Sequence, residues 1–194
     1  RILDTLERVP REHYAPAKYS NLAYADMQIP LGHGQVMLEP KVEGRLLQAL
    51  DPQPTEKTLE IGTGAGYLTH CLAQLSAHVT SVELFPDLRE QAEHNLQRAG
   101  VDNIHLHTGD AARGWSDGRH YDVIAVTASL PEMHPGFHQS LSMGGRLFLI
   151  VGQPPIMEAV LITRVGEDQW ATESLFDTSA PALVGAPVSQ PFDF

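Results

Sequence analysis

The sequence predicts an α/β fold, with a twisted, mostly parallel sheet between helices on both faces and an antiparallel hairpin at its C-terminal end. Three observations predict it. Apolar strand-like segments alternate with helix-like segments over residues 57–151, a glycine-rich turn follows the first strand, and a short loop joins the last two strands. Such alternation is typical of parallel sheets, because each crossover helix covers the sheet. The length of 194 residues fits one domain.

The N-terminal region, residues 1–55, is expected to form a cover and a loop on the substrate side. Its first apolar residues have the spacing of a short amphipathic helix: Ile2, Leu3, Leu6 and Val9. Pro10 ends this helix, and residues 10–35, rich in aromatic residues, Pro and Gly, are predicted to be irregular. A stretch of this length is either functional or covered by other elements. A second helix is predicted to begin at Pro40 and to end before Asp51-Pro52.

Residues 56–152 form the predicted ligand-binding core. Its strands are predicted at Lys57–Ile61, His78–Glu83, Asn103–His107, Tyr121–Thr127 and Gly145–Val151. Its helices are predicted at Tyr67–Leu75, from Pro86 to about Ala99, and over residues 135–142. The apolar character of the strands indicates that both faces of the sheet are buried.

Residues 153–194 are expected to form the hairpin and a tail. Two strands, Met157–Val165 and Gln169–Phe176, are joined by the short loop of residues 166–168. We expect this hairpin to add antiparallel strands to one edge of the sheet. Residues 177–194 contain three prolines and are expected to be extended or loosely ordered.

Composition excludes several classes of function. The chain has 13 Lys and Arg against 24 Asp and Glu, a formal net charge of −11, which argues against a nucleic-acid-binding protein. No apolar run is long enough for a membrane span. The single cysteine, Cys71, excludes an internal disulfide and suits a reducing, cytoplasmic location. His134 and His138 have a spacing that can bind metal, but no third ligand is evident, and no metal is expected.

The strongest local signal is a turn with glycine at positions 62, 64 and 66, preceded by Glu60. Glycine allows a ligand to approach the backbone closely, and this turn lies where the strands of a doubly wound sheet open their ligand crevice. Glu83 ends the next strand, about 20 residues further on, where a carboxylate can accept hydrogen bonds from both hydroxyls of a ribose. The pattern therefore predicts a ligand that contains a ribose.

The nucleotide that fits best is S-adenosylmethionine (AdoMet). A dinucleotide fingerprint requires glycine at position 67, which is Tyr67 in this chain. AdoMet has no pyrophosphate, so the helix N-terminus need not bind one. AdoMet also carries an ammonium group, beside which the carboxylate of Glu60 would be suitable. NAD binding, or glycines that only form a tight connection between strand and helix, are the alternatives.

Two further residues are candidates at the same edge of the sheet. Asp110 follows the third strand and can accept a hydrogen bond from the adenine amino group, although Asp in such a place is commonly a turn or cap residue. Thr127 ends the fourth strand near the expected crevice. Its alternative role is to satisfy neighbouring backbone groups.

On these residues the chain resembles the protein-L-isoaspartate O-methyltransferase family. The resemblance spans nearly the whole chain, and the run Pro30–Gln35 is more specific to the family than the glycine turn. Its pieces are Val9–Glu12, Leu22–Tyr24, Pro30–Gln35, Leu59–Tyr67, Ser81–Glu83, Gly109-Asp110, Gly114-Trp115, Val126–Ala128, Pro131-Glu132, Gly144–Leu147 and Val151-Gly152.

The resemblance implies a Rossmann-like AdoMet-dependent methyltransferase fold and a protein-repair reaction. In that reaction the free α-carboxylate of an isoaspartyl residue in a damaged protein or peptide receives a methyl group, and AdoMet becomes S-adenosylhomocysteine. The implied cofactor residues are Glu60, Gly62, Thr63, Gly64, Gly66, Glu83, Leu84, Gly109 and Asp110. The reaction-side candidates are Gln35, Leu38 and Thr127.

The sequence departs from the family where the substrate would be held. The family has a hydroxyl residue at position 38, which holds the substrate carboxylate, and threonine at position 36; this chain has Leu38 and Val36, followed by Glu39. The C-terminal stretch of residues 176–183 also differs from the family's pattern. We therefore expect AdoMet binding to survive and isoaspartyl methylation to be weak or absent. Three hypotheses stay open: isoaspartyl methylation with other donors, methylation of another acceptor, and AdoMet binding without catalysis.

Overall fold

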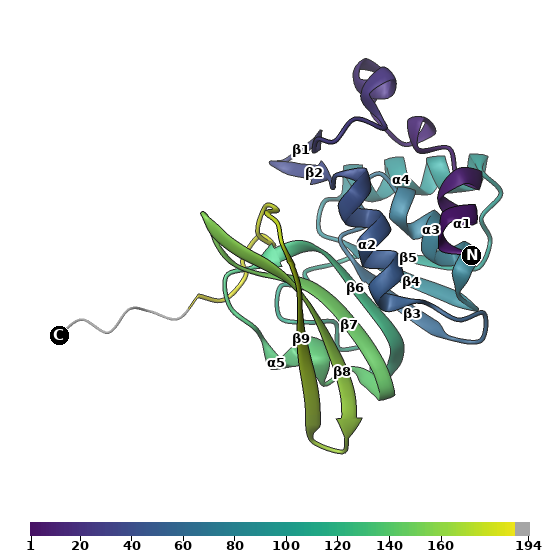
Figure 1. The fold of residues 1–194 in the computed structure, drawn as a ribbon. Coiled ribbons are helices and arrows are strands. Elements are labelled where there is room, and N and C mark those ends of the chain that lie inside the picture. The colour runs from purple at the N-terminus through teal and green to yellow at the C-terminus, as the bar shows by residue number, and fades with distance from the viewer. Residues whose placement is uncertain (189–194) are drawn as a thin grey trace.

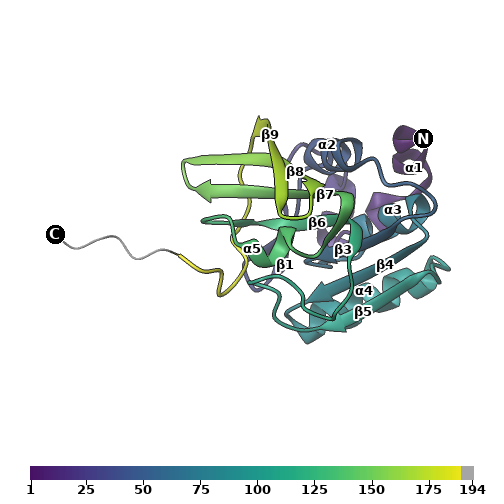
Figure 2. The ribbon, with the colours of Figure 1, turned by 90° about the horizontal axis from the view of Figure 1, so that it is seen from below.

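The computed structural model describes residues 1–188 and contains the predicted sheet. Seven strands pair in the order β5-β4-β3-β6-β7-β8-β9. The strands β3 to β7 are parallel neighbours, and β8 and β9 are added antiparallel at one edge (Figures 1 and 2). Their bounds are β3 (Lys57–Ile61), β4 (His78–Glu83), β5 (Ile104–Thr108), β6 (Tyr121–Leu130), β7 (Leu141–Gln153), β8 (Ile156–Gly166) and β9 (Gln169–Asp177).

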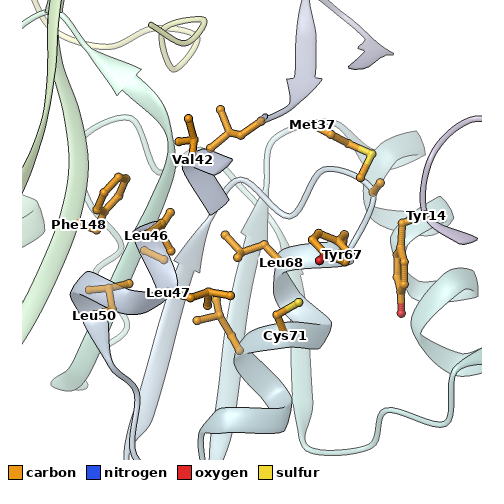
Figure 3. Packing of buried hydrophobic residues seen from close by; sticks show 14 of the residues in the cluster. Tyr14, Met37, Val42, Leu46, Leu47, Leu50, Tyr67, Leu68, Cys71 and Phe148 are labelled. Atoms are coloured by element: carbon orange, nitrogen blue, oxygen red, sulfur yellow. The ribbon is translucent and has the colours of Figure 1, made fainter. Parts of the chain in front are cut away.

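The helices cover the two faces of the sheet unequally. They are α1 (Ile2–Arg8), α2 (Pro40–Leu50), α3 (Tyr67–Leu75), α4 (Pro86–Arg98) and α5 (Pro135–His138). Helices α2, α3 and α4 share one apolar cluster with the sheet, in which Leu47 of α2, Leu68 of α3 and Phe148 of β7 are buried (Figure 3). The other face packs against the short helix α5 and against loop residues such as Ala111 and Leu183.

One helix was predicted too long. A helix was expected over residues 135–142, but α5 ends at His138 and Leu141 already belongs to β7. The backbone nitrogen of Tyr121 donates to the carbonyl oxygen of Ser140 at 2.9 Å, and Tyr121 pairs with Leu141. Pairing with the neighbouring strand therefore takes these residues into the sheet, which starts β7 earlier than the predicted Gly145.

The irregular N-terminal stretch contains a small hairpin that the sequence pattern did not predict. Two 3₁₀ helices, η1 (Arg11–His13) and η2 (Ala17–Leu22), precede strands β1 (Ile29–Gly32) and β2 (Gln35–Met37), which pair antiparallel as a separate sheet. The tip has left-handed backbone conformations, with φ of 53° at His33 and 70° at Gly34. The hairpin lies at the same end of the molecule as the first turn of α2 (Figure 1).

The C-terminal segment after β9 is extended and attached to the end of β6. The backbone nitrogen of Ser129 donates to the carbonyl oxygen of Pro181, and that of Leu183 donates to Ser129, both at 2.9 Å. The side chain of Ser129 donates to the carbonyl oxygen of Ala180 at 2.8 Å. The expectation of an extended tail is met for these residues, and its last part, residues 189–194, lies outside the described residues.

No helix within residues 1–188 combines the length and apolar character needed to cross a membrane.

Candidate functional site

Six of the nine predicted cofactor residues line a cleft at the carboxyl ends of β3, β4, β5 and β6. The residues that line it include Gly62, Gly64, Glu83, Leu84, Gly109 and Asp110, together with Gln35 and Thr127. A second hollow beside the first is lined by Glu60, Thr63 and Leu38, and shares Gly62, Gly64 and Thr127 with it. Residues predicted from five separate segments of sequence therefore share one composite site.

The three glycines of the turn pack against different neighbours. Gly62 has a φ of 97°, and a Cβ there would lie 2.3 Å from Oγ1 of Thr127, so only glycine lets the turn approach β6 this closely. Gly64 has a φ of 55° and faces Leu31 of the β1–β2 hairpin. Gly66 is the N-cap of α3, and a Cβ there would meet Leu96 of α4 at 3.2 Å. Gly66 lines neither hollow, so its place in the structure is at the packing of two helices.

Thr127 braces the turn. Its hydroxyl lies 2.7 Å from the carbonyl oxygen of Gly62 and 3.1 Å from that of Ile61. The sequence left two roles open for Thr127, and these contacts fit the second, in which its side chain hydrogen-bonds to neighbouring backbone groups. Because Thr127 lines both hollows, the reaction-side role stays a prediction.

Glu83 is held at the floor of the cleft by backbone amides. Its Oε2 accepts from the nitrogen of Gly64 at 2.9 Å, and its Oε1 accepts from the nitrogen of Phe85 at 3.2 Å. A carboxylate has about four acceptor positions, so these two bonds orient the group without exhausting it. The remaining lone pairs can accept hydrogen bonds from two neighbouring hydroxyls of a ligand.

Glu60 is fully buried and incompletely hydrogen-bonded. Its Oε2 accepts from Oγ1 of Thr69 at 2.5 Å and from Oγ of Ser81 at 2.6 Å. Its Oε1 has no hydrogen-bond partner within residues 1–188. Burial raises the pKa of Glu60 to about 8, against the opposing effect of the two hydroxyl donors. A buried carboxyl group with a free oxygen beside a hollow is suited to receive a cationic or hydrogen-bond-donating ligand group.

Asp110 forms a turn and lines the cleft at once. Its Oδ1 accepts from the backbone nitrogen of Ala112 at 2.9 Å, as expected for an Asp in a turn. The preceding Gly109 has the ring of Trp115 against it, and a Cβ there would lie 2.7 Å from that ring. The turn thus places Asp110 at the cleft edge, and the adenine contact stays a prediction.

The β1–β2 hairpin extends along the cleft to the start of α4. The ring of His33 stacks on Phe85 with a centroid distance of 4.1 Å, and Nε2 of His33 lies 2.8 Å from Oδ2 of Asp87. The amide of Gln35 donates to the carbonyl oxygen of His33 at 3.3 Å. Gln35 therefore helps to order the hairpin tip, and its role toward a substrate stays a prediction.

A buried arginine holds the segment that carries Leu38. Nη2 of Arg11 donates to the carbonyl oxygen of Leu38 and Nε donates to that of Ala23, both at 2.6 Å. Nη1 of Arg11 pairs with Glu43 of α2, and both side chains are buried. Sequence reasoning missed this ion pair. The sequence feature that could have indicated it is Glu43, an acidic residue between Val42 and Leu46 on the apolar face of a predicted helix.

The C-terminal segment completes the cleft. Leu183 and Val184 line it beside Ala128 of β6. Sequence reasoning missed them, because prolines and small residues indicate extended backbone without saying where the segment packs.

Within the described residues no group of three or more His, Cys, Asp or Glu side chains could hold a metal ion. Nδ1 of His134, one of the two histidines with metal-binding spacing, instead accepts a hydrogen bond from the nitrogen of Gly136 at 3.1 Å.

Comparison with known proteins places this chain in a family. The family model for Protein-L-isoaspartate(D-aspartate) O-methyltransferase matches residues 1–179. The chain is 35% identical over 186 residues to Protein-L-isoaspartate O-methyltransferase 2 of Marinobacter nauticus, covering 95% of this chain and 85% of the relative. It is 36% identical over 188 residues to the Protein-L-isoaspartate O-methyltransferase of Protochlamydia amoebophila, covering 95% of this chain and 89% of the relative.

The fold has a counterpart among solved structures. A Plasmodium falciparum structure described as a protein-L-isoaspartate O-methyltransferase in complex with S-adenosyl-L-homocysteine superimposes with a TM-score of 0.79. The match covers 94% of this chain and 89% of that chain at 22% identity, so the likeness is one of fold.

Proposed function

The chain belongs to the protein-L-isoaspartate(D-aspartate) O-methyltransferase family, and from this membership we propose that it is an AdoMet-dependent methyltransferase whose cofactor binds in the cleft at the carboxyl ends of β3 to β6. The observation that carries the proposal is Glu83, fixed by the amides of Gly64 and Phe85 beside the glycine turn. Its free lone pairs suit the two hydroxyls of a ribose.

The other groups of the composite site fit the rest of AdoMet. The unpartnered Oε1 of Glu60 would accept from the ammonium group, and Asp110 would accept from the adenine amino group. Leu84 and Phe85 offer apolar walls. When bound, AdoMet supplies a methyl group on an already activated sulfonium, so this chain's task is to position the acceptor and to exclude water.

At positions 36 and 38 the chain has apolar side chains where the family resemblance implies hydroxyl donors for an isoaspartyl carboxylate. A carboxylate is ionised at neutral pH and requires hydrogen-bond donors more than a base. In this chain Val36, Met37 and Leu38 line the second hollow, and Leu38 is only 3% exposed. We therefore propose that methylation of isoaspartyl residues in proteins or peptides is weak and that a less polar acceptor is preferred. AdoMet binding without catalysis is the second candidate, because the same apolar lining favours it.

The direct test is to incubate the protein with AdoMet and an isoaspartyl peptide and to measure S-adenosylhomocysteine. We expect AdoMet binding with little product. Rapid turnover would contradict the weak-activity proposal and would support a working isoaspartyl enzyme with other donors. Absence of AdoMet binding would contradict all three hypotheses.

Replacing Leu38 with serine is expected to raise isoaspartyl methylation at least about tenfold over replacing it with alanine. A hydrogen bond to a charged group contributes about 1.5–3 kcal/mol, and ~1.4 kcal/mol corresponds to a factor of ten. Leu38→Ala is the matched control, because it leaves a similar cavity without the hydroxyl. The measurement is kcat/KM for the isoaspartyl peptide. Equal activity of the two variants would shift the cause to the changed residues 176–183.

AdoMet affinity is expected to rise with pH between about pH 6 and pH 7, by at most about tenfold. The free protein keeps the proton on Glu60 in this range, since its pKa is raised to about 8. A neighbouring ammonium favours the ionised carboxylate, so binding releases a proton and becomes tighter as pH rises. Calorimetry should show this slope in the wild type and weaker, pH-independent binding in Glu60→Gln. The same slope in Glu60→Gln would contradict the assignment.

Two broader expectations belong to this proposal. We propose a cytoplasmic location, because the single thiol, Cys71, is free and buried. We also propose that residues 1–55 cover the substrate side, residues 56–152 bind the cofactor and residues 153–194 form the C-terminal hairpin and tail. The C-terminal part also lines the cofactor cleft, through Leu183 and Val184.

A further inference from the structure

A third hollow, of different character, lies at the opposite ends of the strands. Its volume is about 330 Å³, and it is lined by Lys57, His78, Thr80, Arg119, His120 and Tyr121. Lys57, His78 and Tyr121 are the first residues of β3, β4 and β6, whereas the cofactor cleft lies where these strands end. The third hollow is therefore separate from the cofactor site, and its role is independent of the proposed function.

The cationic side chains at this hollow are not paired with carboxylates. Within residues 1–188, neither the ammonium of Lys57 nor the guanidinium of Arg119 takes part in an ion pair or a side-chain hydrogen bond. By contrast, Arg146 pairs with Glu56 and Arg89 pairs with Glu93. The chain has a formal net charge of −11, so carboxylates outnumber cationic side chains, and yet these two cations have no carboxylate partner among the described residues.

The neighbouring carboxylates bind other groups. Asp117 accepts from the backbone nitrogen of Arg119 at 3.0 Å and from the hydroxyl of Tyr121 at 2.6 Å. Asp122 accepts from the backbone nitrogen of Lys57 at 2.9 Å. These bonds position the segments that carry the two cations and leave the cationic ends available to a ligand.

Histidines add donors to the same surface. Burial lowers the pKa of His78, and the charges of His105, Arg119 and Lys57 lower it further. His105 stacks on His107 with a centroid distance of 4.5 Å. The electrostatic effect on His78 thus comes from positive groups on β3, on β5 and on the loop before β6. An anion bound at the hollow would relieve this repulsion.

We propose that this hollow binds a phosphate group, either as inorganic phosphate or as the phosphate of a small monoester. Arg119 and Lys57 supply the charged donors, and the rings of His78 and His120 lie at the same hollow as further donors. Guanidinium groups pair with phosphate through two parallel hydrogen bonds, and ammonium groups bind it as point charges. The acidic remainder of the chain repels extended polyanions, which favours a small phosphate compound over a nucleic acid.

The test follows the histidine signals of the full-length chain by NMR during titration with inorganic phosphate, and separately with glycerol phosphate, at constant ionic strength. We expect saturable shifts of His78 and a rise in its pKa. Saturation by both compounds indicates that the hollow accepts a monoester, and saturation by inorganic phosphate alone indicates a free-ion site. Either result supports the proposal.

Variants make the proposal falsifiable. Arg119→Ala and Lys57→Ala should each weaken phosphate binding at least tenfold, and both residues are exposed, so the fold should tolerate their loss. Arg98→Ala, an exposed change on α4, is the control and should leave phosphate binding unchanged. AdoMet binding should be the same in all three. Absence of saturation, equal shifts with chloride, or equal loss in Arg98→Ala would overturn the proposal.

Discussion

Arg11→Ala is expected to lower the free energy of unfolding by about 3–5 kcal/mol, as removal of one partner from a buried ion pair commonly does. Arg11 is 1% exposed, pairs with Glu43 and donates to the carbonyl oxygens of Ala23 and Leu38. Its loss would leave the carboxylate of Glu43 buried without its cation and would free two buried carbonyl groups. Urea unfolding measures the effect.

Two controls separate the ion pair from the general effect of removing an arginine. Arg8→Ala removes an exposed arginine from α1 and should change stability by no more than about 0.5 kcal/mol. The double variant Arg11→Ala with Glu43→Ala should lose less than the sum of the two single variants, because no buried charge then remains. An Arg11→Ala protein as stable as Arg8→Ala would contradict the role given to this pair.

The second large effect is expected at the cofactor cleft. Glu83→Gln should weaken AdoMet binding about a hundredfold or more, because each hydrogen bond to a charged group contributes about 1.5–3 kcal/mol. Glutamine also turns an NH₂ group toward one of the two amides, of Gly64 and Phe85, that the carboxylate now binds. Isothermal titration calorimetry with AdoMet measures the loss.

The matched control for this prediction is Glu90→Gln, which makes the same chemical change at an exposed position of α4. It should bind AdoMet as the wild type does. Equal affinities of Glu83→Gln and the wild type would remove Glu83 from the cofactor site.

The middle of the fold could be predicted closely from the sequence. The bounds expected for β3, α3 and β4 agree with the structure, because buried strands are apolar runs and glycines mark the turn between strand and helix. Their order along the chain also places Gly62 and Glu83 at one edge of the sheet. Local pattern sufficed here because local and tertiary preferences coincide.

Elsewhere tertiary contacts decided the structure. Leu141 follows a helical pattern but pairs with Tyr121 in the sheet. The strands of the β1–β2 hairpin are short, include Pro30, and show no alternation that a sequence pattern could reveal. The pairing of Arg11 with Glu43 joins residues that are distant in sequence. Such contacts depend on how elements pack, which periodicity does not encode.

The site shows the same division. Positions next to the glycine turn lie at the cleft as expected, whereas Gly66 packs against α4 and Leu183 reaches the cleft from the far end of the chain. Motif spacing identifies residues near a motif. It does not identify residues such as Leu183, which line the cleft from a distant segment of the chain.

A crystal structure with S-adenosylhomocysteine is the decisive measurement for the cofactor site. We expect the nucleoside in the cleft beside the glycine turn, with both ribose hydroxyls within about 3.2 Å of the Glu83 carboxylate. A ligand bound elsewhere, or a ribose held by another residue while Glu83 contacts only the amides of Gly64 and Phe85, would contradict the role assigned to Glu83 and to the turn.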